Sequence, residues 1–151
     1  MRGRLVAGLV LAMLGAPAAC HRKETAVTRP SEDAPSPTLS RLAHEIGLTF
    51  PASARLIWVG RETGIDDMVS FKVEIAPADL PGFLAASPVP ADAFAPGEGG
   101  LLGSDLGLWN PSQAARLRTG QVVRADHSAL NIGVDDGKPN IVVLYIVSHG
   151  T

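Results

Sequence analysis

Seven consecutive apolar residues, Ile141-Val142-Val143-Leu144-Tyr145-Ile146-Val147, form the longest apolar run outside the N-terminal region of this 151-residue chain. A run of this length suits a buried β-strand, and it is far shorter than the roughly 20 residues that a membrane-spanning helix needs. Because neither alternate set of positions is polar, both faces of this strand should be covered. We therefore expect residues 140–147 to form the central strand of a sheet, with a helix packed on one side.

A second strand is predicted over Met68–Ile75 by strict alternation. Apolar residues occupy the odd positions from 69 to 75, and polar or charged residues occupy the even positions between them. One face should therefore pack in the core while the other meets water. Residues 55–59 form a shorter apolar strand before it, and the turn residues at 64–67 suit an antiparallel hairpin between the two.

Two more strands are expected at residues 121–125 and 129–134. The segment Asp135-Asp136-Gly137-Lys138-Pro139 would then join the second of them to the central strand as a tight hairpin loop. Gly137 is available there for a positive φ, which such turns require.

Helical periodicity marks residues 38–46, with Gly47 placed to end the helix, and residues 77–86, which carry a proline in the first turn. A very short helix is expected after Asn110, which should act as its N-cap. The sum is an α+β domain: a mostly antiparallel sheet of four to five strands, with one principal helix packed on it and additional short helices.

Residues 87–108 are rich in proline and glycine, and we expect them to form a long loop. Loops of this length inside a domain tend to be functional or mobile. Trp109 follows the loop, and two roles are open for it. It packs over the sheet edge and pins the loop, or it anchors a partner, since aromatic residues dominate interface hot spots. In the second case the contact surface would be Trp109 with Leu101, Leu102 and Leu108.

The N-terminal region has the features of an export signal. Two arginines precede an apolar run over residues 5–14, and small, turn-prone residues follow at 15–19. Cys20 comes directly after them and is the only cysteine of the chain. An exported lone cysteine has no intramolecular disulfide partner, so modification of the thiol is the simplest explanation for its presence.

The junction resembles a bacterial lipoprotein signal peptide, in which small residues precede a cysteine that becomes acylated. Ala18 and Ala19 fill the small positions, and the resemblance covers only the first 20 residues. It implies that Cys20 becomes the mature N-terminus. The acyl chains would then hold the protein to a membrane of the cell envelope, facing the periplasm or the exterior. The alternative is an ordinary leader cut after Ala18 or Ala19, which would release a soluble secreted protein.

This interpretation divides the chain into three parts. Residues 1–19 are the signal peptide, residues 20–37 are the lipidated cysteine and a flexible tether, and residues 38–151 are one small domain. Removal of the leader lowers the 13 basic residues to 11 against 15 acidic ones, a net charge of −4. This charge, and the lack of a basic stripe with interleaved aromatic residues, argue against a nucleic-acid partner.

No catalytic or metal-binding motif stands out in the sequence. The histidines at 21, 44, 127 and 149 are scattered, and no two have the i, i+4 spacing of a helical zinc site. The triplet Asp126-His127-Ser128 contains the residue types of a catalytic triad, but strand neighbours alternate faces, so a surface turn is the better interpretation. The doublets Asp66-Asp67 and Asp135-Asp136 do not match a calcium loop. We expect no metal and no cofactor.

The sequence therefore favours a membrane-anchored, non-catalytic module that binds a protein partner. One form of it would be an immunity- or inhibitor-type lipoprotein that blocks a toxin or an enzyme. The alternative is an envelope hydrolase that uses His127, His149 and an acid, which would have to meet in one concave pocket. The sequence leaves the biological role and the oligomeric state open.

Overall fold

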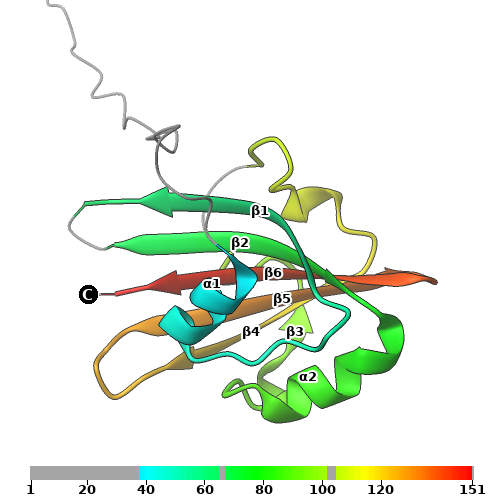
Figure 1. Ribbon diagram of the computed structural model, residues 1–151, viewed down its shortest axis with the longest axis horizontal. Coiled ribbons are helices and arrows are strands. Elements are labelled where there is room, and N and C mark those ends of the chain that lie inside the picture. Colours follow the sequence, from blue (N-terminus) through cyan, green and yellow to red (C-terminus); the bar gives the residue numbers. More distant parts are fainter. Residues whose placement is uncertain (1–37, 65–66, 102–104, 151) are drawn as a thin grey trace, which may run out of the picture.

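The computed structural model describes residues 38–64, 67–101 and 105–150. Its centre is one antiparallel sheet with the strand order β1-β2-β6-β5-β4-β3. The strands are β1 (Arg55–Glu62), β2 (Met68–Ile75), β3 (Ala95–Pro96), β4 (Leu117–Val123), β5 (Ala129–Lys138) and β6 (Ile141–His149). The helices α1 (Leu39–Ile46) and α2 (Leu80–Ala86) lie on the same face of this sheet (Figure 1). The leader, Cys20, the tether and Leu102 lie outside the described residues.

The apolar run at 141–147 is the central strand, as predicted. β6 pairs with β2 on one side and with β5 on the other along nearly its whole length. Its even positions face the helices, and its odd positions face the opposite side of the sheet. All residues from Val142 to Val147 are buried. Both faces of the strand are therefore covered, which explains why the run contains no polar position.

The helical face contains the larger part of the core. α1 contributes Leu42 and Ile46, α2 contributes Phe83, and β2 contributes its odd positions. Phe50 joins the two layers, because its ring stacks on Phe83 at 5.4 Å between ring centroids and meets Phe71 edge-on at 6.1 Å. These apolar contacts, together with those of β5 and β6, hold the two short helices on the sheet.

The predicted helix at 38–46 is confirmed together with both of its ends. The backbone N–H of Arg41 donates to Oγ1 of Thr38 at 3.3 Å, and Gly47 ends the helix with φ at 67°. The predicted principal helix at 77–86 is divided into a 3₁₀ turn at Pro77–Asp79 followed by α2. The helix expected after Asn110 is a 3₁₀ turn at Pro111–Gln113. Asn110 is the N-cap residue, but its side chain does not accept a backbone N–H of the turn, because Oδ1 of Asn110 accepts from Lys72 instead.

The α+β class and the antiparallel sheet agree with the sequence analysis, but the sheet has six strands rather than four to five. The additional strand, β3, lies in the segment that we expected to be a loop over residues 87–108. It consists of Ala95 and Pro96, which pair with Thr119 and Arg118 of β4. Proline is confined to edges because it has no N–H to give to a ladder, and β3 is the edge strand next to β4.

The predicted hairpin loop at 135–139 is wrong in its position. β5 continues to Lys138, and the turn consists of Pro139 and Asn140. The cause is a register shift between Asp135 and Lys138, where the buried carboxylate of Asp135 accepts backbone N–H bonds from Ala115, Arg116 and Gly137. Gly137 has no positive φ. A Cβ added at Gly137 would lie 2.6 Å from Cβ of Ala115, which is closer than two such atoms can approach, so this position requires glycine for lack of space.

Candidate functional site

The second face of the sheet is covered by residues 97–101 and 105–116, which we call the strap. Leu101 and Trp109 of the strap pack against Val143, Tyr145 and Val147 of β6. The indole of Trp109 is 3% exposed, and its ring lies 5.4 Å from Trp58 and 5.3 Å from Tyr145 between centroids. The strap therefore supplies the apolar layer that β6 needs on the side away from the helices.

Of the four residues that the sequence suggested as a partner contact, the structure describes three. Leu101 is 6% exposed and Trp109 is nearly fully covered, so little of either side chain is available to a partner. Leu101 fits against Gly133, where an added Cβ would lie 2.7 Å from its Cδ1. Leu108, in contrast, is 57% exposed. The burial favours the role in which Trp109 pins the loop, although the indole packs on the central strand β6 and not only over the sheet edge. The apolar surface available to a partner is therefore on the neighbouring turn.

That turn comprises Leu106, Gly107, Leu108 and Trp109, and we call it the leucine turn. Leu106 and Trp109 exchange two backbone hydrogen bonds, at 2.6 Å and 3.0 Å, and Gly107 takes a φ of 59°. The two leucine side chains are 50% and 57% exposed. The sequence analysis missed Leu106. The signal that could have found it is the pattern Leu-Gly-Leu, in which a glycine suited to a tight turn separates two apolar residues.

Polar contacts fix the backbone of the leucine turn. Nζ of Lys72 donates to the carbonyl oxygen of Leu108 at 3.0 Å and to Oδ1 of Asn110 at 2.6 Å. On the other side, the carboxylate of Asp105 accepts hydrogen bonds from the hydroxyl and the backbone N–H of Ser112. The two leucines are therefore presented on a backbone that is held at both ends.

Lys72 and Tyr145 lie beneath this turn, and burial changes the titration of both. Nζ of Lys72 lies 5.2 Å from the centroid of the Tyr145 ring, which is cation–π distance. Burial lowers the pKa of Lys72 and raises the pKa of Tyr145 to about 12. The phenol of Tyr145 is therefore protonated at neutral pH, and its hydroxyl lies 3.3 Å from the carbonyl oxygen of Asn110, to which it donates. The contacts of Lys72 and Tyr145 with Leu108 and Asn110 therefore hold the strap against the sheet.

One buried polar side chain under the strap has no partner among the described residues. Asn131 of β5 is fully buried, and neither atom of its amide group makes a hydrogen bond there. Gly100 lies directly over it with a φ of 80°, and a Cβ at that position would collide with Oδ1 of Asn131. The strap can approach the sheet this closely only because residue 100 is glycine.

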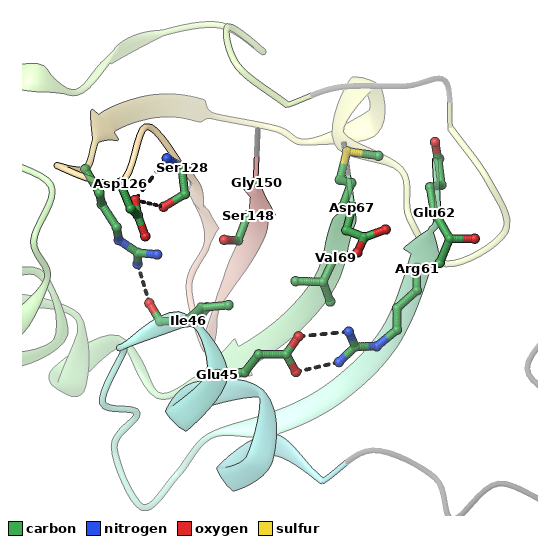
Figure 2. Close-up of a pocket in the computed structure, with 13 residues that line it drawn as sticks. Glu45, Ile46, Arg61, Glu62, Asp67, Val69, Asp126, Ser128, Ser148 and Gly150 are labelled. Atoms are coloured by element: carbon green, nitrogen blue, oxygen red, sulfur yellow. Dashed lines mark hydrogen bonds and ion pairs between the residues drawn. The ribbon is translucent and has the colours of Figure 1, made fainter. Parts of the chain in front are cut away.

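A separate pocket of about 340 Å³ lies at the end of the sheet next to α1 (Figure 2). Its 13 lining residues include four carboxylates, from Glu45, Glu62, Asp67 and Asp126, and two guanidinium groups. Figure 2 shows Arg61 and Glu45 pointing toward each other, with two hydrogen bonds of 2.8 Å and 2.6 Å. This hydrogen bonding lowers the pKa of Glu45 and raises the pKa of Arg61.

The other half of this pocket is also occupied by internal contacts. Arg124 donates to the carbonyl oxygen of Ile46 at the C-terminal end of α1, where a cation is favourable. The hydroxyl and the backbone N–H of Ser128 donate to Asp126 at 2.6 Å and 3.0 Å, which lowers the pKa of that carboxyl. Both arginines are thus bound to groups of their own chain.

The pocket does not bring the predicted catalytic candidates together. Asp126 and Ser128 line it, as do Ser148 and Gly150, but His127 and His149 do not. His127 lies in the turn between β4 and β5, with a φ of 66°. Within residues 38–64, 67–101 and 105–150, no three His, Cys, Asp or Glu side chains gather in a way that could hold a metal ion. In the same residues, no helix has the length and apolar character needed to cross a membrane.

Comparisons with known proteins add no functional information. No family model, no curated protein and no solved structure shows a significant match to this chain.

Proposed function

We propose that this chain is a lipid-anchored protein of the cell envelope whose domain binds a protein partner through the leucine turn and performs no chemistry of its own. The anchor rests on the resemblance of residues 1–20 to a lipoprotein signal peptide. The single observation that carries the binding function is the exposure of Leu106 and Leu108 on one turn with a fixed backbone.

Isolated exposed leucines are common on protein surfaces and call for no explanation. Here, however, the two leucines stand on a turn of four residues, and their backbone is held by Lys72 and Asp105. Burying a leucine side chain contributes about 1.5–3 kcal/mol, so a partner that covers both gains a useful apolar contact. A turn that is already ordered also loses less conformational entropy when it binds.

The test is quantitative capture of partners from intact envelopes by the full-length protein after cross-linking. The double variant Leu106→Ser/Leu108→Ser should lose most of the captured partner, because it removes the apolar contact and leaves the buried residues unchanged. Val123→Ser is the matched control, since Val123 is 63% exposed and lies at the end of β4, outside the strap. It should capture as wild type does.

Circular dichroism and thermal unfolding should show that both variants keep the wild-type fold. Equal capture by wild type and the double variant would contradict the proposal. An equal loss of captured partner in the double variant and in Val123→Ser would contradict it as well, since binding would then not depend specifically on the leucine turn.

A further inference from the structure

The outer edge of β1 is free in the described part of the chain. β1 is the first strand in the order β1-β2-β6-β5-β4-β3, and it pairs only with β2. It is eight residues long, whereas the opposite edge of the sheet carries the two-residue strand β3. A free edge presents unpaired N–H and C=O groups to any strand that can align with it.

The charges at the two ends of β1 are opposite. Arg55 begins the strand and Glu62 ends it, and both side chains are exposed. Neither forms an ion pair with another described residue, whereas the neighbouring Arg61 is bound to Glu45. In an antiparallel pair of two β1 strands, Arg55 of each copy would lie opposite Glu62 of the other.

An irregularity in β1 makes this pairing geometrically consistent. Residues seven positions apart in a regular strand point to opposite faces. The register of β1 shifts between Leu56 and Trp58, so Ile57 is an additional residue. Arg55 is consequently opposite Glu74 and Glu62 is opposite Met68, two residues of β2 at even positions, which share one face.

With Ile57 set aside, seven positions remain, and Val59 is the central one. A two-fold axis at Val59 places Arg55 opposite Glu62, Leu56 opposite Arg61 and Trp58 opposite Gly60 of the other copy. In each pair the two residues share a face, which an antiparallel ladder requires. From this self-complementary register we propose that two copies of this chain pair through their β1 edges and extend the sheet across the two-fold axis.

The experiment measures the dimer dissociation constant of the full-length protein in detergent micelles by sedimentation equilibrium. Wild type should dimerise. Arg55→Glu and Glu62→Arg should each raise the dissociation constant about tenfold, because both symmetry-related ion pairs are replaced by like charges. The charge-swapped variant Arg55→Glu/Glu62→Arg should return to within about threefold of wild type, since opposite charges face each other again.

An equimolar mixture of the two single variants provides the most discriminating test. Two copies of the same variant place like charges opposite each other, whereas one copy of each variant restores opposite charges at both ends of the pair. Heterodimers should therefore dominate the mixture, and native mass spectrometry can distinguish them from homodimers by mass. Lys138→Glu and Glu98→Arg are matched reversals away from β1 and should leave the dissociation constant unchanged. The proposal would be overturned by a monomeric wild type, by a dissociation constant that does not change with the charge reversals at 55 and 62, or by a mixture without heterodimer.

Discussion

Two residues, Gly100 and Asn131, explain how closely the strap approaches the sheet. Gly100 lies over the fully buried Asn131, and the amide of Asn131 finds no hydrogen-bond partner among the described residues. An unsatisfied buried amide costs about 1–3 kcal/mol, so this contact is maintained by its surroundings, mainly by the burial of Leu101 and Trp109. The sequence did not indicate this pair, because a glycine in a Gly-rich segment gives no sign of what it will cover.

We therefore expect Gly100→Ala to be more destabilising than a comparable change elsewhere in the strap. Gly97 also has a positive φ, of 111°, but a Cβ there would meet nothing within 4 Å, so Gly97→Ala is the matched control. The control should lose about 1 kcal/mol of unfolding free energy from backbone strain alone. Gly100→Ala should lose about 3 kcal/mol, because overpacking against Asn131 is added to the strain.

Urea denaturation monitored by tryptophan fluorescence measures both losses. The double variant Gly100→Ala/Asn131→Ala should lose less than the sum of its two single changes, because the clash has been removed. Equal losses in Gly97→Ala and Gly100→Ala would show that the close approach has no energetic consequence.

Among the elements, those defined by a local pattern were predictable and those defined by distant contacts were not. β2 has the predicted bounds, and α1 ends at its predicted glycine stop. β4 begins at Leu117, four residues before the predicted start, because its first residues pair with β5 and β3 rather than following any alternation of their own. β3 was missed for the same reason: two residues carry no period, and only their pairing makes them a strand.

The candidate site was predictable in part on the same grounds. Composition pointed to the segment around 101–109, where the exposed turn lies. The assignment of exposed and buried positions within it depends on which leucine meets Gly133 and which indole meets Trp58, and no local pattern carries that information.

The role of the strap as the second cover of the sheet can be measured through Trp109. Trp109→Ala should reduce the free energy of unfolding by about 3–5 kcal/mol, since a large buried side chain is lost and a cavity is left behind. Trp109→Phe, which keeps an aromatic ring between Trp58 and Tyr145, should lose clearly less. Guanidinium denaturation measures the free energy of unfolding of wild type and of both variants. A loss below about 1 kcal/mol for Trp109→Ala would mean that the strap contributes little to the core.

In the molecule as a whole, the helices and the strap cover the two faces of one sheet, so little of the sheet remains for contact with other molecules. Exposed features of the described residues include the leucine turn, the free edge of β1 and the pocket beside α1, whose arginines are already bound to groups of their own chain. If the proposed function holds, the domain would act by presenting a surface, and the membrane anchor would decide where that surface is presented.

The anchor is the part of the account on which the proposed location and the manner of presentation both depend. Its most direct test is mass spectrometry of the N-terminal peptide of the mature protein, purified from the membrane fraction of its native host. We predict a peptide that begins at Cys20 and carries a diacylglyceryl thioether, and loss of the protein from that fraction in Cys20→Ser. An unmodified thiol, or a mature chain that begins at another residue, would contradict the account.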